Sequence, residues 1–218
     1  MTKAKTGVMP NAATEIRSVA SQFGNPRGFL GRLALTSMAY KNGRYNDAAR
    51  QALDLQPGDK VLEIGCGPGV SLRKVARLIG RSGFAAGVDY APLAVRMARH
   101  KLHWMISRGR AQVLQASAED LPFEAARFDK AYAVNSFQFW PKPHEGLGEL
   151  ARVLKPGGKV VITNHFKSGK GVRASLEKLS APLANLIGWH SDFALETVLQ
   201  EDGLSVEQQE NIPPFGMM

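Results

Sequence analysis

The sequence of 218 residues is poor in cysteine, in long apolar runs and in acidic residues. Because Cys66 is its only cysteine, no intramolecular disulfide can form, which is consistent with a reducing compartment. No apolar run approaches the roughly 18 residues that suggest a membrane-spanning helix. The lysines of residues 1–13 are followed by no apolar segment, so we expect no signal peptide. These absences favour a cytoplasmic protein, and peripheral contact with a membrane stays open.

Basic residues outnumber acidic ones by 28 to 19, which gives a formal net charge of +9. The excess is concentrated at the start, where residues 1–50 contain only two acidic side chains, Glu15 and Asp47. A basic segment of this kind attracts RNA, anionic lipid or an acidic substrate, or it simply keeps the surface soluble. The sequence alone does not separate these interpretations.

From residue 57 onward, short apolar segments alternate with helical patterns. Strands are expected at residues 60–64, 84–88, 111–115, 128–134, 159–163 and 204–209. Helices are expected at residues 71–79, after Pro92, and at 143–154, 172–186 and 193–201. This alternation predicts an α/β fold, a doubly wound and mostly parallel sheet covered on both faces. We expect residues 1–14 to form a flexible tail, 15–56 a helical segment and 57–218 the core.

A glycine-rich turn follows the first expected strand, where residues 63–69 read EIGCGPG. Glycines at alternate positions let a ligand approach the backbone, and the following helix directs N–H groups toward it. The dinucleotide fingerprint requires a further glycine where this chain has Val70, so the turn fits a nucleoside better than a pyrophosphate. A tight turn without any ligand is the alternative interpretation.

The second expected strand ends in an acidic residue, since residues 87–90 read GVDY. Asp89 lies 20 residues beyond the glycine-rich turn, the spacing at which a carboxylate accepts both hydroxyls of a ribose. Tyr90 offers a flat face for a base. Alternatively, Asp89 only caps the helix that begins at Pro92.

Five segments resemble the motifs of class I S-adenosylmethionine-dependent methyltransferases, in order and in spacing, over roughly residues 45–165. They are residues 61–69 (VLEIGCGPG), 87–89 (GVD), 116–123 (ASAEDLPF), 128–129 (FD) and 152–158 (RVLKPGG). The nearest group is the ubiquinone/menaquinone-biosynthesis-like, methyltransferase domain 11-type group, whose members act on varied small molecules and lipids. The resemblance implies a Rossmann-like fold, S-adenosyl-L-methionine as cofactor and S-adenosyl-L-homocysteine as product.

The resemblance also implies which residues bind the cofactor: Glu63, Gly65, Cys66, Gly67, Gly69, Asp89, Tyr90, Ser117, Ala118, Glu119 and Asn135. The three glycines would contact the methionine part, Glu63 its amino group and Asp89 the ribose. Ser117 stands where the family often has aspartate or asparagine, so its contact with adenine is expected to be weaker or water-mediated. Cys66 is expected to be a small packing residue.

The acceptor pocket is expected beside the fourth strand, where residues 135–140 read NSFQFW. Methyltransferases of nucleobase amines usually carry two prolines at this point, so their absence argues against a DNA substrate. The aromatic residues either line an apolar pocket or belong to the core. Pocket candidates are Tyr40, Tyr45, Phe137, Trp140 and His190. Catalytic candidates are Asn135, which the resemblance places toward the methionine part or the sulfonium, and His165 as a general base or as a structural residue.

Residues 15–56 resemble the lid that varies most among small-molecule methyltransferases. The apolar residues of 29–35 are interleaved with Arg27 and Arg32, so this segment either touches a membrane surface or packs on the domain. The family normally adds a seventh, antiparallel strand, and the sequence after residue 209 leads us to expect that strand to be absent, very short or removed.

Taken together, these patterns predict in-line methyl transfer to a small-molecule or lipid-like acceptor. Two other hypotheses stay open: an RNA or protein methyltransferase that uses the basic N-terminal region, and a cofactor-binding protein without catalysis. Neither an H-E-x-x-H motif nor a cysteine cluster is present, so we expect no metal.

Overall fold

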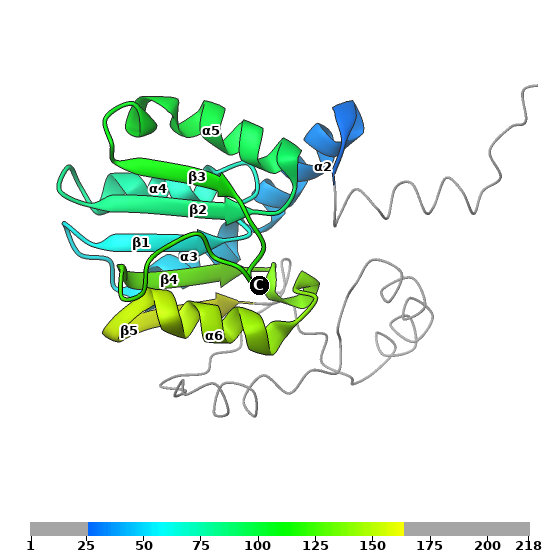
Figure 1. Ribbon diagram of the computed structural model, residues 1–218. Helices are drawn as coiled ribbons and strands as arrows, with labels where there is room; N and C mark the ends of the chain where they lie inside the picture. The colour runs from blue at the N-terminus through cyan, green and yellow to red at the C-terminus, as the bar shows by residue number, and fades with distance from the viewer. Residues whose placement is uncertain (1–25, 164–218) are drawn as a thin grey trace, which may run out of the picture.

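The computed structural model describes residues 26–163. Two helices, α2 (Gly28–Lys41) and α3 (Gly43–Leu53), precede the sheet. The strands are β1 (Lys60–Ile64), β2 (Phe84–Asp89), β3 (Ala111–Gln115), β4 (Phe128–Val134) and β5 (Leu154–Thr163). The remaining helices are α4 (Val70–Leu78), α5 (Pro92–Ile106), the short 3-10 helix η1 (Phe137–Phe139) and α6 (Pro143–Val153) (Figure 1). The expected tail, the elements expected after residue 163, His165 and His190 lie outside the described residues.

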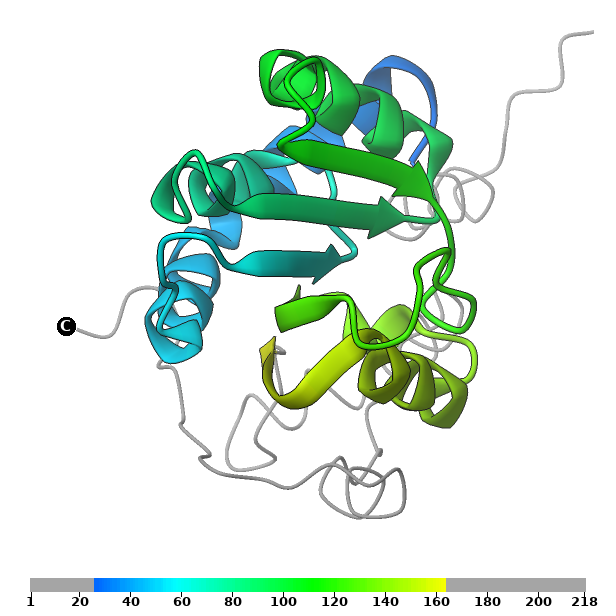
Figure 2. The same ribbon diagram turned by 60° about the vertical axis from the view of Figure 1, so that its left-hand side comes forward.

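The five strands form one sheet in the order β3-β2-β1-β4-β5, and every neighbouring pair is parallel. The chain builds β1, β2 and β3 toward one edge and then returns to place β4 on the other side of β1 (Figure 2). This reversal confirms the predicted doubly wound fold. It also puts the topological switch point at the carboxyl ends of β1 and β4, where ligands bind in such sheets.

Apolar residues cover both faces of the sheet, which explains why its strands read as nearly continuous apolar runs. One core joins the sheet to α3, α4 and α5 through residues such as Leu53, Val75 and Leu102. The other joins it to α6 and to the loop that follows β3, through residues such as Leu150 and Phe123. Since strand side chains alternate, β1 contributes to both cores.

The connection from β3 to β4 contains no helix. Its loop is instead held by α6: the Arg152 guanidinium donates to the carbonyl oxygens of Leu121 at 3.0 Å and Phe123 at 2.8 Å. The Glu149 carboxylate accepts from the backbone N–H of Leu121 at 2.8 Å. Two charged side chains therefore satisfy backbone groups that a helix would otherwise pair internally.

The boundaries of the last helix and strand differ from the prediction. The proline-glycine segment after α6 was expected to separate helix from strand, but β5 already begins at Leu154. Phe128 pairs with Leu154 and Lys130 with Lys159, so residues 155–158 form a bulge opposite a single residue of β4. That residue, Asp129, forms an ion pair with the bulged Lys155. The ion pair holds the bulged segment against β4.

Helix α2 lies beside the first turns of α5 (Figures 1 and 2). Its buried Leu35 packs against Ala91, Leu93 and Ala94. None of the helices between residues 26 and 163 combines the length and the hydropathy needed to cross a membrane.

Candidate functional site

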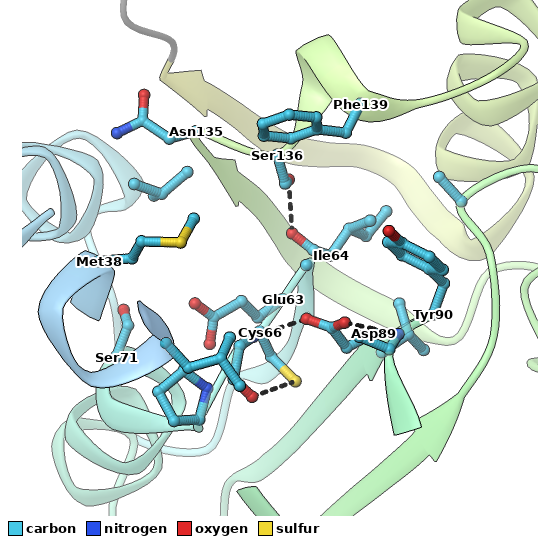
Figure 3. Close-up of a pocket in the computed structure, with 18 of the residues that line it drawn as sticks. Met38, Glu63, Ile64, Cys66, Ser71, Asp89, Tyr90, Asn135, Ser136 and Phe139 are labelled. Atoms are coloured by element: carbon cyan, nitrogen blue, oxygen red, sulfur yellow. Dashed lines mark hydrogen bonds between the residues drawn. The ribbon is translucent and has the colours of Figure 1, made fainter. Parts of the chain in front are cut away.

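A cavity of about 350 Å³ opens at the carboxyl ends of the strands (Figure 3). One wall consists of the turn after β1, the end of β2, the loop after β3 and the end of β4. The opposite wall comes from α2 and the start of α3. The cavity therefore lies at the switch point and joins the sheet to the N-terminal helices.

The turn after β1 runs so close to the end of β4 that it requires glycine. Gly65 has a φ of 71°, and a Cβ atom there would stand 2.4 Å from the Cβ of Ser136. The Ser136 hydroxyl donates to the Ile64 carbonyl at 2.9 Å and fixes this approach. The turn also pairs with β2, since the backbone N–H groups of Gly65 and Cys66 donate to the Val88 carbonyl at 2.9 and 3.0 Å. A side chain at Gly65 would push the turn after β1 away from the end of β4.

Asp89, at the end of β2, accepts hydrogen bonds from two backbone segments, the turn after β1 and the start of α5. One carboxylate oxygen accepts from the N–H of Gly67 at 2.8 Å, and the other accepts from the N–H of Ala91 at 2.9 Å. Burial raises the pKa of Asp89, and these two hydrogen bonds oppose the rise. The contact with Ala91 places the Asp89 carboxylate just before α5, but the cap of that helix is Ala91 and has no side-chain cap hydrogen bond. A carboxylate oxygen has further lone pairs, so this geometry leaves acceptor capacity toward the cavity.

Glu63 is buried beside the same cavity, with its side chain directed between Met38 and Asp89 (Figure 3). The hydroxyl of Tyr132 hydrogen-bonds its carboxyl group, whereas Oε2 has no partner among residues 26–163. Burial is the main reason why the pKa of Glu63 rises from 4.5 to about 8, and the nearby Asp89 adds to the rise. A buried carboxyl group with one unpartnered oxygen next to a cavity is suited to receive a cationic or hydrogen-bond-donating ligand.

Asn135 connects the end of β4 to the N-terminal helices. Its φ of 50° turns the chain out of the strand, and its backbone N–H donates to the Thr163 carbonyl at 2.7 Å. Its side-chain amide donates to the Oδ1 atom of Asn42, at the junction of α2 and α3, at 2.9 Å. Asn42 lines the cavity but was not among the site residues predicted from the sequence. No local pattern reveals this contact, because it joins residues 93 positions apart.

Most of the predicted site residues do line the cavity: Glu63, Gly65, Cys66, Gly67, Asp89, Tyr90, Ser117, Ala118, Glu119, Asn135 and Trp140. Cys66 is also buried, and burial raises the pKa of its thiol well above the usual value. A neutral, enclosed thiol agrees with the packing role expected for this residue. Among residues 26–163, no group of three or more histidine, cysteine or acidic side chains could hold a metal ion.

Gly69 was expected to contact the cofactor but does not line the cavity. It forms the N-cap of α4 with a φ of 73°. A Cβ atom there would lie 2.8 Å from the Leu102 side chain and 3.0 Å from the Cα of Ala98. Glycine is required at this position because α5 crosses the turn.

Three aromatic candidates for the acceptor pocket do not line this cavity. Tyr40 lies on the outer side of α2 and is 84% exposed, whereas Tyr45 is buried in the core beneath α3. Phe137 packs on Trp140 with ring centroids 4.9 Å apart, within the core on the α6 side. Hydrophobic residues at helical spacing thus face either solvent or core, depending on how the helix is rotated against the sheet.

The apolar wall of the cavity was not predicted from the sequence. Leu35, Met38 and Ala39 of α2 form one part, and Phe139 with Pro141 forms another. The helical spacing of Leu35 and Met38 was visible in the sequence. Which partner they face depends on the docking of α2, which no local signal specifies.

Comparison with known proteins gives consistent results. A family model described as "Methyltransferase domain" matches residues 62–162. The phosphatidylethanolamine N-methyltransferase of Cereibacter sphaeroides is 36% identical over 160 residues, 73% of this chain and 77% of that protein. The 2-phytyl-1,4-naphtoquinone methyltransferase of Trichormus variabilis is 30% identical over 147 residues, 64% of this chain and 63% of that protein. The structure of a SAM dependent methyltransferase from Aquifex aeolicus superposes with a TM-score of 0.62 at 18% identity, over 88% of this chain and 90% of that one. The chain belongs to the class I S-adenosylmethionine-dependent methyltransferases.

Proposed function

We propose that this methyltransferase acts on an amphiphilic, lipid-like acceptor. The observation that carries the proposal is the division of the cavity into two chemically different walls. The wall at the strand ends includes the carboxyl groups of Glu63 and Asp89. In contrast, α2 and the segment after β4 contribute the apolar side chains of Leu35, Met38 and Phe139. Apolar pockets with a few convergent polar groups are typical small-molecule sites.

The residues of the polar wall fit S-adenosylmethionine, the family's cofactor. The unpartnered Oε2 of Glu63 suits the amino group of the methionine part, a hydrogen-bond donor that is positively charged when protonated. A Cβ atom on Gly67 would meet nothing within 4 Å, so this position faces open space that a ligand can occupy. When bound, the cofactor supplies an electrophilic methyl group on a sulfonium.

Individual residues receive the following proposed roles. Glu63 and the backbone of Gly65 and Gly67 hold the methionine part, and Asp89 accepts the ribose hydroxyls. Tyr90 lies along adenine, with Ser117 and Ala118 at its edge. Asn135 orients the reacting end because its side chain is fixed by Asn42. These groups position the reactants and exclude water, which alone supplies several kcal/mol, on the order of 7–11 in favourable cases.

The acceptor enters against the apolar wall in this proposal. The names of two relatives, a phosphatidylethanolamine N-methyltransferase and a phytyl-naphtoquinone methyltransferase, both describe acceptors with long apolar chains. No histidine between residues 26 and 163 lines the cavity. His165, which follows β5 in the sequence, therefore stays the predicted general base for an acceptor that must lose a proton.

Transfer of a labelled methyl group tests the proposed acceptor class. The full chain is incubated with a bacterial extract and methyl-labelled S-adenosylmethionine, and the extract is then separated into lipid, water-soluble, RNA and protein fractions. We expect label in the organic-solvent-soluble lipid fraction, and none above background with Asp89→Ala. Label confined to RNA or protein would overturn the proposal, and so would the absence of transfer in every fraction.

The raised pKa of Glu63 leads to a stability prediction. Between pH 4.5 and about 8 the folded protein keeps a proton on Glu63 that the unfolded chain releases. Stability of the cofactor-free protein should therefore fall as pH rises through this window, by at most about 1.4 kcal/mol per pH unit for one group. Urea unfolding between pH 5.5 and 8 measures this slope.

Glu63→Gln is the matched control, because it keeps the shape of the side chain and removes its titration. The difference in unfolding free energy between the wild type and this variant should shrink or reverse with rising pH. A cationic ligand favours the ionised carboxyl, so saturating S-adenosylmethionine should reduce the wild-type loss at high pH. Parallel pH profiles for the two proteins would contradict the assignment of a raised pKa to Glu63.

A further inference from the structure

Helices α2, α4 and α5 carry charge of one sign only. None of the three contains an aspartate or a glutamate. They surround a groove of about 520 Å³ that is separate from the cofactor cavity. Its polar lining comes from Arg32, Arg73, Arg96, His100, Lys101 and His103. This groove is a concentrated positive surface that the proposed methyl transfer does not use.

The cations of the groove are not neutralised within the described part of the chain. None of Arg32, Arg73, Arg96 and Lys101 forms an ion pair with an acidic residue of 26–163. Arg99, on the same helix as Arg96, behaves differently, because it donates to the Val113 carbonyl at 2.8 Å and supports the fold. Cations without an acidic partner, three of them exposed and Lys101 half-buried, create around one groove a positive potential that attracts anions.

Large apolar side chains stand next to this groove on α2. Phe29, Leu30 and Leu33 are 74%, 63% and 53% exposed. Phe29 and Leu33 are four residues apart and Arg32 lies between them, so one face of the helix presents apolar side chains and a groove cation together. The opposite face of α2 is occupied, since Leu35 packs on α5 and Met38 lines the cavity.

We propose that this surface, formed by the groove and by the first turns of α2, docks on an anionic lipid bilayer. The groove cations contact lipid phosphates, while Phe29, Leu30 and Leu33 enter the boundary between headgroups and acyl chains. Exposed aliphatic side chains distinguish a bilayer from RNA, which offers phosphates but no apolar layer. The positive charge of the surface selects anionic over zwitterionic membranes.

Docking in this way has a consequence for catalysis that rests on the proposed function. Leu33 of α2 is exposed, whereas Leu35 packs on α5 and Met38 lines the cavity. A bilayer on the exposed side of α2 would therefore lie one helix diameter from the apolar wall of the cavity. A lipid acceptor could reach the cavity while its chains stay in an apolar environment. Vesicle binding itself requires neither cofactor nor acceptor, so its failure can be distinguished from failure of methyl transfer.

Vesicle flotation of the full chain tests the docking surface. Vesicles of phosphatidylcholine alone are compared with vesicles that also contain phosphatidylglycerol, without cofactor. We expect binding to the anionic vesicles only, weakening as salt is added. The double variant Arg96→Glu/Lys101→Glu should bind these vesicles roughly 600-fold more weakly, since each basic residue near an anionic surface contributes about a fivefold factor and each of the two charge reversals counts twice.

Matched control variants separate this surface from general effects of charge and hydrophobicity. Arg81→Glu changes an exposed arginine in the turn between α4 and β2, outside the groove. Leu78→Ser changes a leucine that is 57% exposed at the end of α4 and serves as the control for Leu30→Ser. Both controls should bind like the wild type, whereas Leu30→Ser should reduce binding several-fold. Affinity for S-adenosylhomocysteine reports whether each variant keeps its fold, and Arg96→Gln/Lys101→Gln replaces the double reversal where it does not.

Three results would overturn the proposal. The wild type could fail to bind anionic vesicles. Alternatively, the groove variants could bind these vesicles as strongly as Arg81→Glu does. The groove variants could also lose salt-sensitive binding to RNA while vesicle binding stays unchanged, which would assign the groove to RNA.

Discussion

Replacing Asp89 with alanine is expected to weaken binding of S-adenosylhomocysteine by about 100- to 1000-fold, because charge-assisted hydrogen bonds are worth roughly 1.5–3 kcal/mol each. The substitution removes the acceptor for the N–H groups of Gly67 and Ala91, and with it the proposed acceptor for the ribose hydroxyls. Isothermal titration calorimetry measures the change. Cofactor affinity equal to that of the wild type would contradict the proposed site.

A second ligand shows whether Asp89 contacts the ribose directly or only supports the turn after β1. An analogue of S-adenosylhomocysteine that lacks the ribose hydroxyls should bind the wild type far more weakly than the parent compound does. Asp89→Ala should discriminate between the two ligands much less. If the variant keeps the full discrimination, Asp89 only braces the backbone, as the capping interpretation holds.

Gly65→Ala is expected to cost about 2–5 kcal/mol of stability, from backbone strain at positive φ together with overpacking. The new Cβ atom would stand 2.4 Å from the Ser136 Cβ, so the turn and the end of β4 must separate. Urea unfolding gives the loss, and binding of S-adenosylhomocysteine should fall with it.

Two other glycines with positive φ provide controls for this result. Gly109, in the turn after α5, has a φ of 67°, and a Cβ atom there would meet nothing within 4 Å, so Gly109→Ala measures backbone strain alone. Gly67→Ala adds a methyl group toward open space and should lose cofactor affinity with a stability cost close to that of Gly109→Ala. A stability loss at Gly65 no larger than at Gly109 would show that contact with Ser136 is unimportant.

The fold was predictable because its signals are local. Most strands contain a short apolar run, and glycines mark turns such as the one within residues 63–69. The order of these segments is enough to predict a doubly wound sheet. The β5 boundary was missed because its bulge depends on pairing with Asp129 of β4, which no pattern within residues 154–163 reveals.

The candidate site was predictable only where a motif encodes it. Glu63, Gly67 and Asp89 line the cavity as expected, because all three end or follow strands that meet at one edge. Tyr40 and Tyr45 do not line the cavity, because the rotation of α2 and α3 about their axes is set by packing against distant segments. For the same reason Asn42 and Met38 were missed.

The helix-free connection between β3 and β4 sets the local stability of one side of the cavity. This loop contains Ala118 at the cavity wall, yet it is attached through Arg152 and Glu149 of α6. Fraying of α6 would release it even if β3 stayed paired, since its backbone lacks a hydrogen-bonded ladder of its own. The loop proposed to contact adenine should therefore open locally whenever α6, which lies on the opposite face of the sheet from α4 and α5, unfolds.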